Sequence, residues 1–187
     1  MSTTIIKHQL QGEIPTWPIE FLFIGTFNPA GGDKVNYYYG REKNQFWKLL
    51  SELFEVKFNP NANDFRQLLK THKIACIDMI DQVEANADRI KRILGEGYKD
   101  SEIINNAVKR LYNTSLIHTI IAQNPGIKIY STWGNGQNLK EWKAEIERLG
   151  EITSLVSPSL AARVPKGENK LNFMLADWRK KIIINSI

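Results

Sequence analysis

The sequence predicts an α/β fold, a three-layer α/β/α sandwich around a short parallel sheet of four strands. Four short apolar runs, typical of buried strands, are distributed along the chain. The segments between them carry apolar residues at helical spacing. Strands that alternate with helices indicate a parallel sheet covered on both faces and joined by right-handed crossovers.

Each element follows from its own pattern. The apolar runs place strands at Glu20–Gly25, Lys73–Met79, Ile127–Thr132 and Ile152–Val156. Helical periodicity predicts helices within Asn44–Phe54, Phe65–Thr71, Lys99–Gln123 (one or two), Asn138–Leu149 and Leu171–Ile184. The polar stretch Asp81–Gly97 is expected to be a mobile insertion. Residues 1–16 are expected to be an N-terminal extension of a single domain that spans 1–187.

Composition narrows the class of protein. The chain has 187 residues, of which 42% are hydrophobic and 24% charged, as in an ordinary globular domain. It has no apolar run long enough to span a membrane and no signal-peptide pattern, so we expect a cytoplasmic protein. The single cysteine, Cys76, excludes an internal disulfide and a four-cysteine zinc site. The three histidines show no metal-ligand spacing, so no metal and no cofactor are expected.

The net charge of +5 is unevenly distributed. Lys34–Lys73 contains eight Lys or Arg against four Asp or Glu, and Val156–Ile187 contains six against two. These segments are either solvated faces or a surface that binds phosphates.

Three loops carry the candidate functional residues. The first strand ends in "FIGTFNPAGG", so Thr26–Gly32 lies at the carboxyl end of a parallel strand, where ligand sites are expected. It contains neither a Walker motif nor a dinucleotide fingerprint. "YYYGREKNQFW" (Tyr37–Trp47) is either a platform for a planar ligand or a lid packed on the core. Asn44 within it either caps a helix or faces the site. The last strand is followed by "SPSLAAR" from Ser157 to Arg163.

In this order, "FIGTFNP", "YYYGREKNQFW" and "SPSLAAR" resemble the motifs of the uracil-DNA glycosylase superfamily, from Phe21 to about Arg163. Within the superfamily, the sequence most resembles the hypoxanthine-DNA glycosylase branch. The important catalytic Asn of that branch precedes x-F-W and matches Asn44. "KIACIDMID" is also similar to that branch, with Asp78 at its usual Asp. If the first loop is aligned on Asn-Pro instead, Asn28 matches the catalytic Asn of the mismatch-specific branch.

The resemblance implies a monofunctional DNA glycosylase of base excision repair, a hydrolase that flips a deaminated or damaged base out of DNA and cleaves its N-glycosidic bond. The implied partner is damaged or mismatched DNA, bound by a monomer. The implied catalytic residues are Asn44 and Asn28, and the implied base-binding residues are Gly25, Thr26, Phe27 and Tyr39. Phe27 is the first choice for stacking on the base. The implied DNA-binding residues are Ser157, Pro158, Ser159, Leu160 (as an apolar wedge), Arg163 and Lys166.

The sequence also departs from the family pattern. "EANADRIKRILGEGYKDSEI" stands in place of the branch's R-P-G-S-L-D segment, and Ser157 stands where many members have His or Asn. Two alternatives therefore remain beside the glycosylase. One is a nucleic-acid-binding protein without catalytic activity on the same fold, and the other is a small-molecule nucleoside or nucleotide hydrolase.

Overall fold

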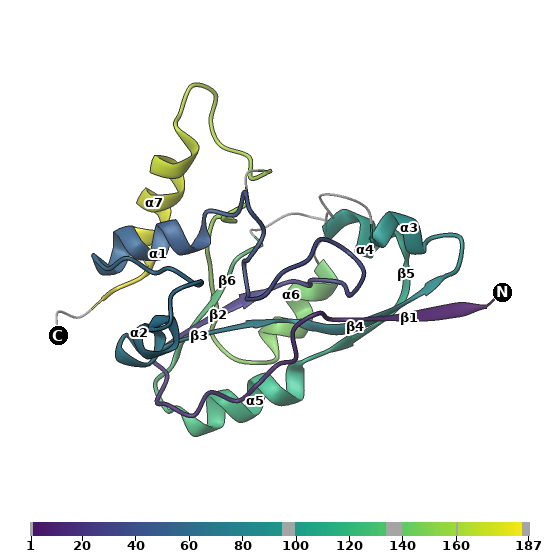
Figure 1. Ribbon diagram of the computed structural model, residues 1–187, viewed down its shortest axis with the longest axis horizontal. Helices are drawn as coiled ribbons and strands as arrows, with labels where there is room; N and C mark the ends of the chain where they lie inside the picture. Colours follow the sequence, from purple (N-terminus) through teal and green to yellow (C-terminus); the bar gives the residue numbers. More distant parts are fainter. Residues whose placement is uncertain (1, 95–99, 134–139, 160, 185–187) are drawn as a thin grey trace.

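The computed structural model describes residues 2–94, 100–133, 140–159 and 161–184. Its centre is a four-stranded parallel sheet in the order β3-β2-β6-β7 (Figure 1). The strands are β2 (Phe21–Gly25), β3 (Ile74–Asp78), β6 (Lys128–Ser131) and β7 (Thr153–Ser154). Each lies within a predicted apolar run, so the predicted parallel sheet is confirmed.

Both faces of this sheet are covered by helices. Phe21 and Phe23 face one way, toward α1 (Phe46–Phe54) and α7 (Lys170–Lys181). Leu22 and Ile24 face the other way, toward α5 (Thr114–Gln123) and α6 (Lys140–Glu147). All five residues of β2 are buried, as expected for a central strand between two helical layers. The three-layer α/β/α architecture is therefore confirmed.

The remaining helices are shorter. They are α2 (Phe65–Thr71), α3 (Ile90–Ile93) and α4 (Asp100–Asn106). The predicted helix at Phe65–Thr71 is confirmed with the same bounds. The ranges predicted to be helical at Asn44–Phe54 and Asn138–Leu149 each contain one observed helix. The helix predicted at Leu171–Ile184 is observed at Lys170–Lys181, so it begins one residue earlier and ends three residues earlier. Residues 138 and 139 lie outside the described part of the chain.

A second sheet, which the sequence did not predict, is antiparallel and has the order β1-β4-β5. Its strands are β1 (Thr3–Lys7), β4 (Ile80–Asn86) and β5 (Ala107–Tyr112). β1 comes from the stretch expected to be an N-terminal extension, and β4 from the stretch expected to be a mobile insertion. β5 interrupts the region predicted as one or two helices.

The two sheets are continuous in the chain and in the core. A single residue, Met79, separates β3 from β4, so the chain passes directly from the parallel sheet into the antiparallel one (Figure 1). Ile6, Val83 and Ile103 join the same buried cluster as Leu22 and Ile24. Residues near the N-terminus are thereby brought against the carboxyl ends of the parallel strands.

Candidate functional site

The candidate site lies where β2 and β3 end, at Gly25 and Asp78, beside the end of β6. Two stretches of the chain meet this edge. The first loop is Thr26–Gly32, and the aromatic loop is Tyr37–Trp47. The carboxyl edge of an open parallel sheet is where such folds bind their ligands.

The side chain of Asp78 is the centre of this edge. The residue is buried, and its carboxylate oxygen Oδ2 lies 2.7 Å from His8 Nε2 and 2.7 Å from Asn28 Nδ2. A Cβ atom at Gly25 would overlap the Asp78 carboxylate and would lie 3.3 Å from the Tyr39 hydroxyl. Gly25 is therefore the residue type that lets the carboxylate and the tyrosine approach the end of β2 this closely.

Tyr39 carries the aromatic loop into the site. It has a left-handed backbone conformation, with φ of 58°, and its ring stacks 3.7 Å from that of Phe46. Its hydroxyl lies 3.0 Å from the Thr132 hydroxyl, just beyond β6. Burial, together with the nearby Cys76 and Asp78, raises the pKa of Tyr39 well above its usual value. Its hydroxyl is therefore a neutral group that can donate a hydrogen bond.

The N-terminal strap, Lys7–Gln9, holds the first loop in place. The backbone N–H of Gln9 donates to the Asn28 carbonyl at 2.8 Å, and the Ala30 N–H donates to the Lys7 carbonyl at 2.8 Å. The Gln9 side chain donates to the Pro29 carbonyl at 2.9 Å. The backbone around Asn28 is therefore fixed by a segment about twenty residues earlier in the chain.

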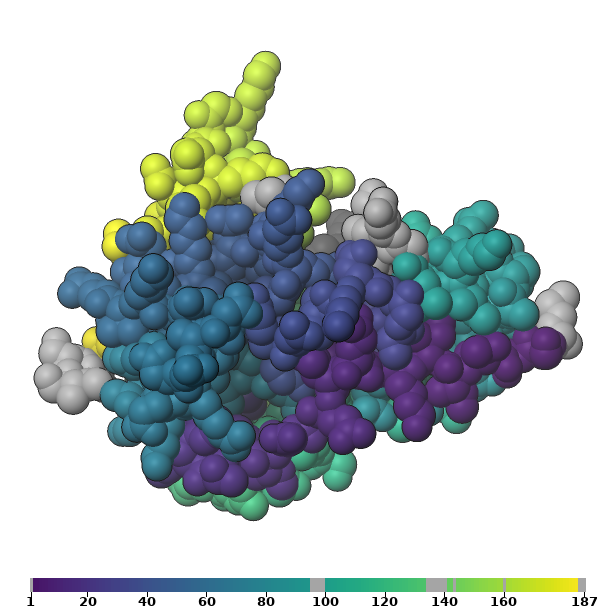
Figure 2. Space-filling view, viewed as in Figure 1, coloured from purple at the N-terminus to yellow at the C-terminus, as the bar shows by residue number. Residues whose placement is uncertain are grey.

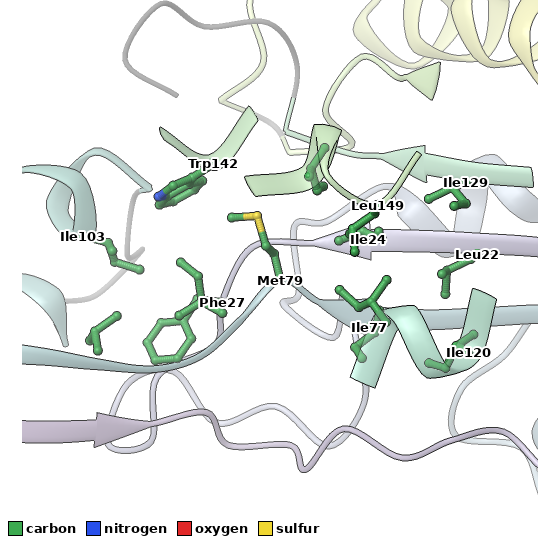
Figure 3. Close-up of a cluster of buried hydrophobic side chains, with 14 of the residues drawn as sticks. Leu22, Ile24, Phe27, Ile77, Met79, Ile103, Ile120, Ile129, Trp142 and Leu149 are labelled. Atoms are coloured by element: carbon green, nitrogen blue, oxygen red, sulfur yellow. The ribbon is translucent and has the colours of Figure 1, made fainter. Parts of the chain in front are cut away.

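Thr26 and Phe27 make contacts that were not predicted from the sequence. The Thr26 hydroxyl donates to Asp100 Oδ1 at 2.9 Å. Phe27 is only 2% exposed, and Figure 3 shows its ring in the buried cluster that includes Met79 and Ile103. Its ring thus packs in the core, whereas the motif resemblance implies that it stacks on a flipped base.

Asn44 lies at the start of α1. Its side-chain oxygen accepts the N–H of Phe46 at 2.9 Å, which satisfies one backbone donor of the first helical turn. The neighbouring Gln45 N–H donates to the Pro158 carbonyl at 2.9 Å. Asn44 is therefore committed to the helix start, and its loop is joined to the turn that follows the last strand.

The chain from Ser157 to Lys170, here called the basic segment, begins shortly after β7 and ends at the first residue of α7. Its first turn is held locally, because the Ser157 hydroxyl oxygen accepts the Ser159 N–H at 3.3 Å. Arg163 and Lys166 are exposed. Figure 2 shows that part of the segment (yellow-green) stands out from the body of the molecule.

The structure brings together only some of the predicted site residues. Gly25, Asn28 and Tyr39 are gathered around Asp78, and Asn44 meets the Ser157–Ser159 turn through a neighbouring backbone bond. Phe27 is in the core, and Leu160 lies outside the described residues. Sequence reasoning missed His8, because no local pattern indicates a partner seventy positions away.

Other features of the described residues bear on the class of protein. No helix among them is both long enough and apolar enough to cross a membrane. Within the same residues no three His, Cys, Asp or Glu side chains are grouped so that they could hold a metal ion. A hollow of about 210 Å³ lies on the antiparallel sheet, lined by Ile5, Gln82, Glu84, Lys109 and Leu111. Glu84 and Lys109 are cross-strand neighbours of opposite charge.

Comparison with known proteins gives a likeness of fold. No family model matches the sequence, and no curated protein matches it. A solution NMR structure from Methanosarcina acetivorans, named "putative Uracil DNA glycosylase", is similar with a TM-score of 0.56 and 20% sequence identity. The likeness covers 89% of this chain and 93% of that one. It shows that the two proteins share a fold.

Proposed function

We propose that this protein is a DNA glycosylase that hydrolyses the N-glycosidic bond of a deaminated or damaged base flipped out of DNA. The observation that carries the proposal is the fold shared with the Methanosarcina protein over 89% of this chain. The motif resemblance runs along the chain in the same order as the loops at the carboxyl edge of the sheet. It favours the hypoxanthine-DNA glycosylase branch, so hypoxanthine is the first lesion to test.

The reaction sets clear requirements for the site. As the base–sugar bond breaks, positive charge develops on the sugar and negative charge on the leaving base. The site must donate hydrogen bonds to the base and hold a water molecule near the sugar. The neutral hydroxyl of Tyr39 is one such donor at the end of the sheet. An asparagine can orient water through its amide but is a weak base, so positioning carries most of the catalysis.

Two asparagines are candidates for holding the water. Asn28 is 9% exposed, and its amide nitrogen faces Asp78, so its amide oxygen is turned away from the carboxylate. Within the part of the chain that the structure describes, no residue donates a hydrogen bond to that oxygen. The oxygen of Asn44 already accepts the Phe46 N–H. Because an acceptor is needed to orient water, these contacts favour Asn28, although the motif resemblance favoured Asn44.

The basic segment is the proposed DNA contact. Arg163 and Lys166 are exposed on a part of the chain that stands out from the body (Figure 2). Exposed Lys and Arg bind phosphates without regard to sequence and position a protein on the duplex. One copy of the chain suffices for this scheme, because every group used belongs to the same chain.

A lesion panel tests the proposal. Duplex oligonucleotides that each carry one uracil, hypoxanthine, xanthine or mismatch are incubated with the protein and assayed for abasic sites. We expect release of at least one base by the parent and none by the Asn28→Ala/Asn44→Ala double variant, which controls for a contaminating glycosylase. Salt-sensitive DNA binding without base release would favour a binding protein. Turnover of a free nucleoside without DNA binding would favour a small-molecule hydrolase.

A further inference from the structure

We infer that Asp78 and His8 are positioning residues that fix the side-chain amide of Asn28, so that its oxygen faces away from Asp78 and toward the reacting water. Only the statement that the oxygen faces the reacting water rests on the proposed function. The orientation of the amide follows from the contacts themselves. The motif resemblance matches Asp78 to a usual aspartate but gives it no function, and it does not include His8.

The carboxylate determines which end of the amide it meets. An ionised carboxylate only accepts hydrogen bonds, and in an asparagine side chain only the NH₂ end donates. The 2.7 Å contact between Asp78 Oδ2 and Asn28 therefore requires the nitrogen on the Asp78 side. The opposite orientation would place two acceptor oxygens against each other in a buried position.

His8 holds the carboxylate in the same way. Its Nε2 lies 2.7 Å from the oxygen that Asn28 contacts, and the two side chains of this pair are only 3% and 4% exposed. Its other nitrogen, Nδ1, lies 2.9 Å from the Leu10 N–H and 2.7 Å from the Leu10 carbonyl. Neutral imidazole can accept from that N–H, and imidazolium can donate to that carbonyl. His8 can thus keep its Nε2–H on Asp78 in either protonation state.

The surroundings of His8 leave the ring little freedom. It packs edge-on to Phe27, with centroids 5.5 Å apart, and lies 6.0 Å from the ring of Tyr38. Burial and the negative charge of Asp78 raise the pKa of Tyr38, so its hydroxyl stays neutral beside the pair. The backbone of residue 8 also donates its N–H to the Asp81 carbonyl at 2.8 Å. Main-chain and ring contacts together aim the imidazole at Asp78.

A purely stabilising role explains this cluster poorly. Replacing a buried charged pair by apolar residues of similar volume is often neutral or stabilising, because burying charge costs desolvation. The cluster does achieve one thing that apolar packing cannot, since it selects one of two amide orientations of Asn28. That selection matters where the amide oxygen must meet a reactant.

The test uses Asp78→Asn, His8→Phe and His8→Gln in the full chain, with His118→Gln on the exposed face of α5 as the matched control. Asp78→Asn keeps the shape but allows either amide orientation, and His8→Phe keeps the ring packing but removes the donor. We expect both to lower single-turnover excision at saturating DNA about tenfold or more. The Kd for DNA should stay within about twofold, because phosphate contacts dominate it. His8→Gln, which retains a donor, should recover part of the rate.

A second measurement is independent of activity. The Asn28 side-chain NH₂ signals in a ¹⁵N-HSQC spectrum are identified by their loss in Asn28→Ala. We expect them to shift in Asp78→Asn and His8→Phe but not in His118→Gln. If they shift while the parent releases no base, the proposed function fails and the orientation of the amide stands. Unshifted Asn28 signals in the folded variants, or a rate loss that merely follows Tm and Kd, overturn the inference.

Discussion

Asn28 and Asn44 are the same residue type in two very different settings. Asn28 is buried, and a charged carboxylate contacts its nitrogen at 2.7 Å. Asn44 is half-buried, and its oxygen accepts a backbone N–H at the start of α1. The difference is therefore which atom of the amide remains for a ligand. Asn28 retains an acceptor, whereas Asn44 retains chiefly its two N–H donors.

The comparison shows that a motif match locates an asparagine without telling what its amide can do. Helix starts commonly use Asn as an acceptor for their unpaired N–H groups, and Asn44 illustrates this use. The orientation of Asn28 depends on Asp78 and on the N-terminal strap, both distant in sequence. A catalytic role for Asn28 can therefore be judged only from the folded chain.

The largest expected effect separates the two asparagines directly. Asn28→Ala should lower single-turnover excision by about 10² or more, as loss of an oriented polar group does elsewhere. Asn44→Ala should lower the rate less than about tenfold while removing about 1 kcal/mol of stability through the lost helix contact. Rates on the best lesion and unfolding midpoints in denaturant measure both. The reverse pattern of rate losses would return the water-holding role to Asn44.

The second prediction concerns a variant that acts on the part of the site around Asn28 and not on Asn44. Gly25→Ala would place a methyl group into the Asp78 carboxylate, so we expect a loss of about 1–3 kcal/mol of stability, as for overpacked cores. Excision should fall with it, because the carboxylate that holds Asn28 must move. Gly126→Ala is the control, since its Cβ would meet no atom within 4 Å and the change costs only left-handed strain. Left-handed strain alone costs about 1–2 kcal/mol, so the loss in Gly126→Ala measures strain without overlap. An unchanged stability of Gly25→Ala would show that the overlap at Gly25 is readily relieved.

The third prediction concerns the Asn44 side, which is joined to the basic segment through Gln45 and Pro158. Arg163→Ala/Lys166→Ala should weaken binding to all DNA sequences alike and reduce the salt slope by about one unit per lost contact. Arg179→Ala/Lys180→Ala removes the same charge from exposed positions of α7 and serves as the control. Fluorescence anisotropy over a series of salt concentrations measures both slopes. Identical slopes in the two double variants would mean that net charge, and not the basic segment, sets the affinity.

The sequence was informative where structure is local. β2 was predicted because a strand buried on both faces is a continuous apolar run, which can be recognised without knowing which strands pair with it. β5 has only partly buried or exposed residues and lies between two helices, so helical periodicity hid it. β1 becomes a strand through pairing with β4, about eighty residues away, for which no local signal exists. The His8–Asp78 contact depends on the same long-range pairing.

The smallest expected effect is a pH dependence on the Asn44 side. His72 packs edge-on against Phe54 and Phe58, with ring centroids 5.4 Å and 5.6 Å away. Phe54 ends α1, the helix whose first N–H is accepted by Asn44. Burial lowers the pKa of His72 below its ordinary value of 6.5, so near that pH the unfolded chain binds more protons than the folded one. The stabilisation that neutral His72 gives the folded chain is therefore fully present above its ordinary pKa. It is lost as the pH falls through the lower pKa that His72 has in the folded chain.

We expect denaturant unfolding to show a larger loss of stability between about pH 7.5 and about pH 5 in the parent than in His72→Gln. His118→Gln, at an exposed histidine, should behave as the parent does. Because Asp78 and Asn28 lie at the other side of the site, the His72-dependent loss should leave the Asn28 amide signals in place. If those signals move with His72 protonation, the two sides of the site are coupled, and the separation drawn between Asn28 and Asn44 does not hold.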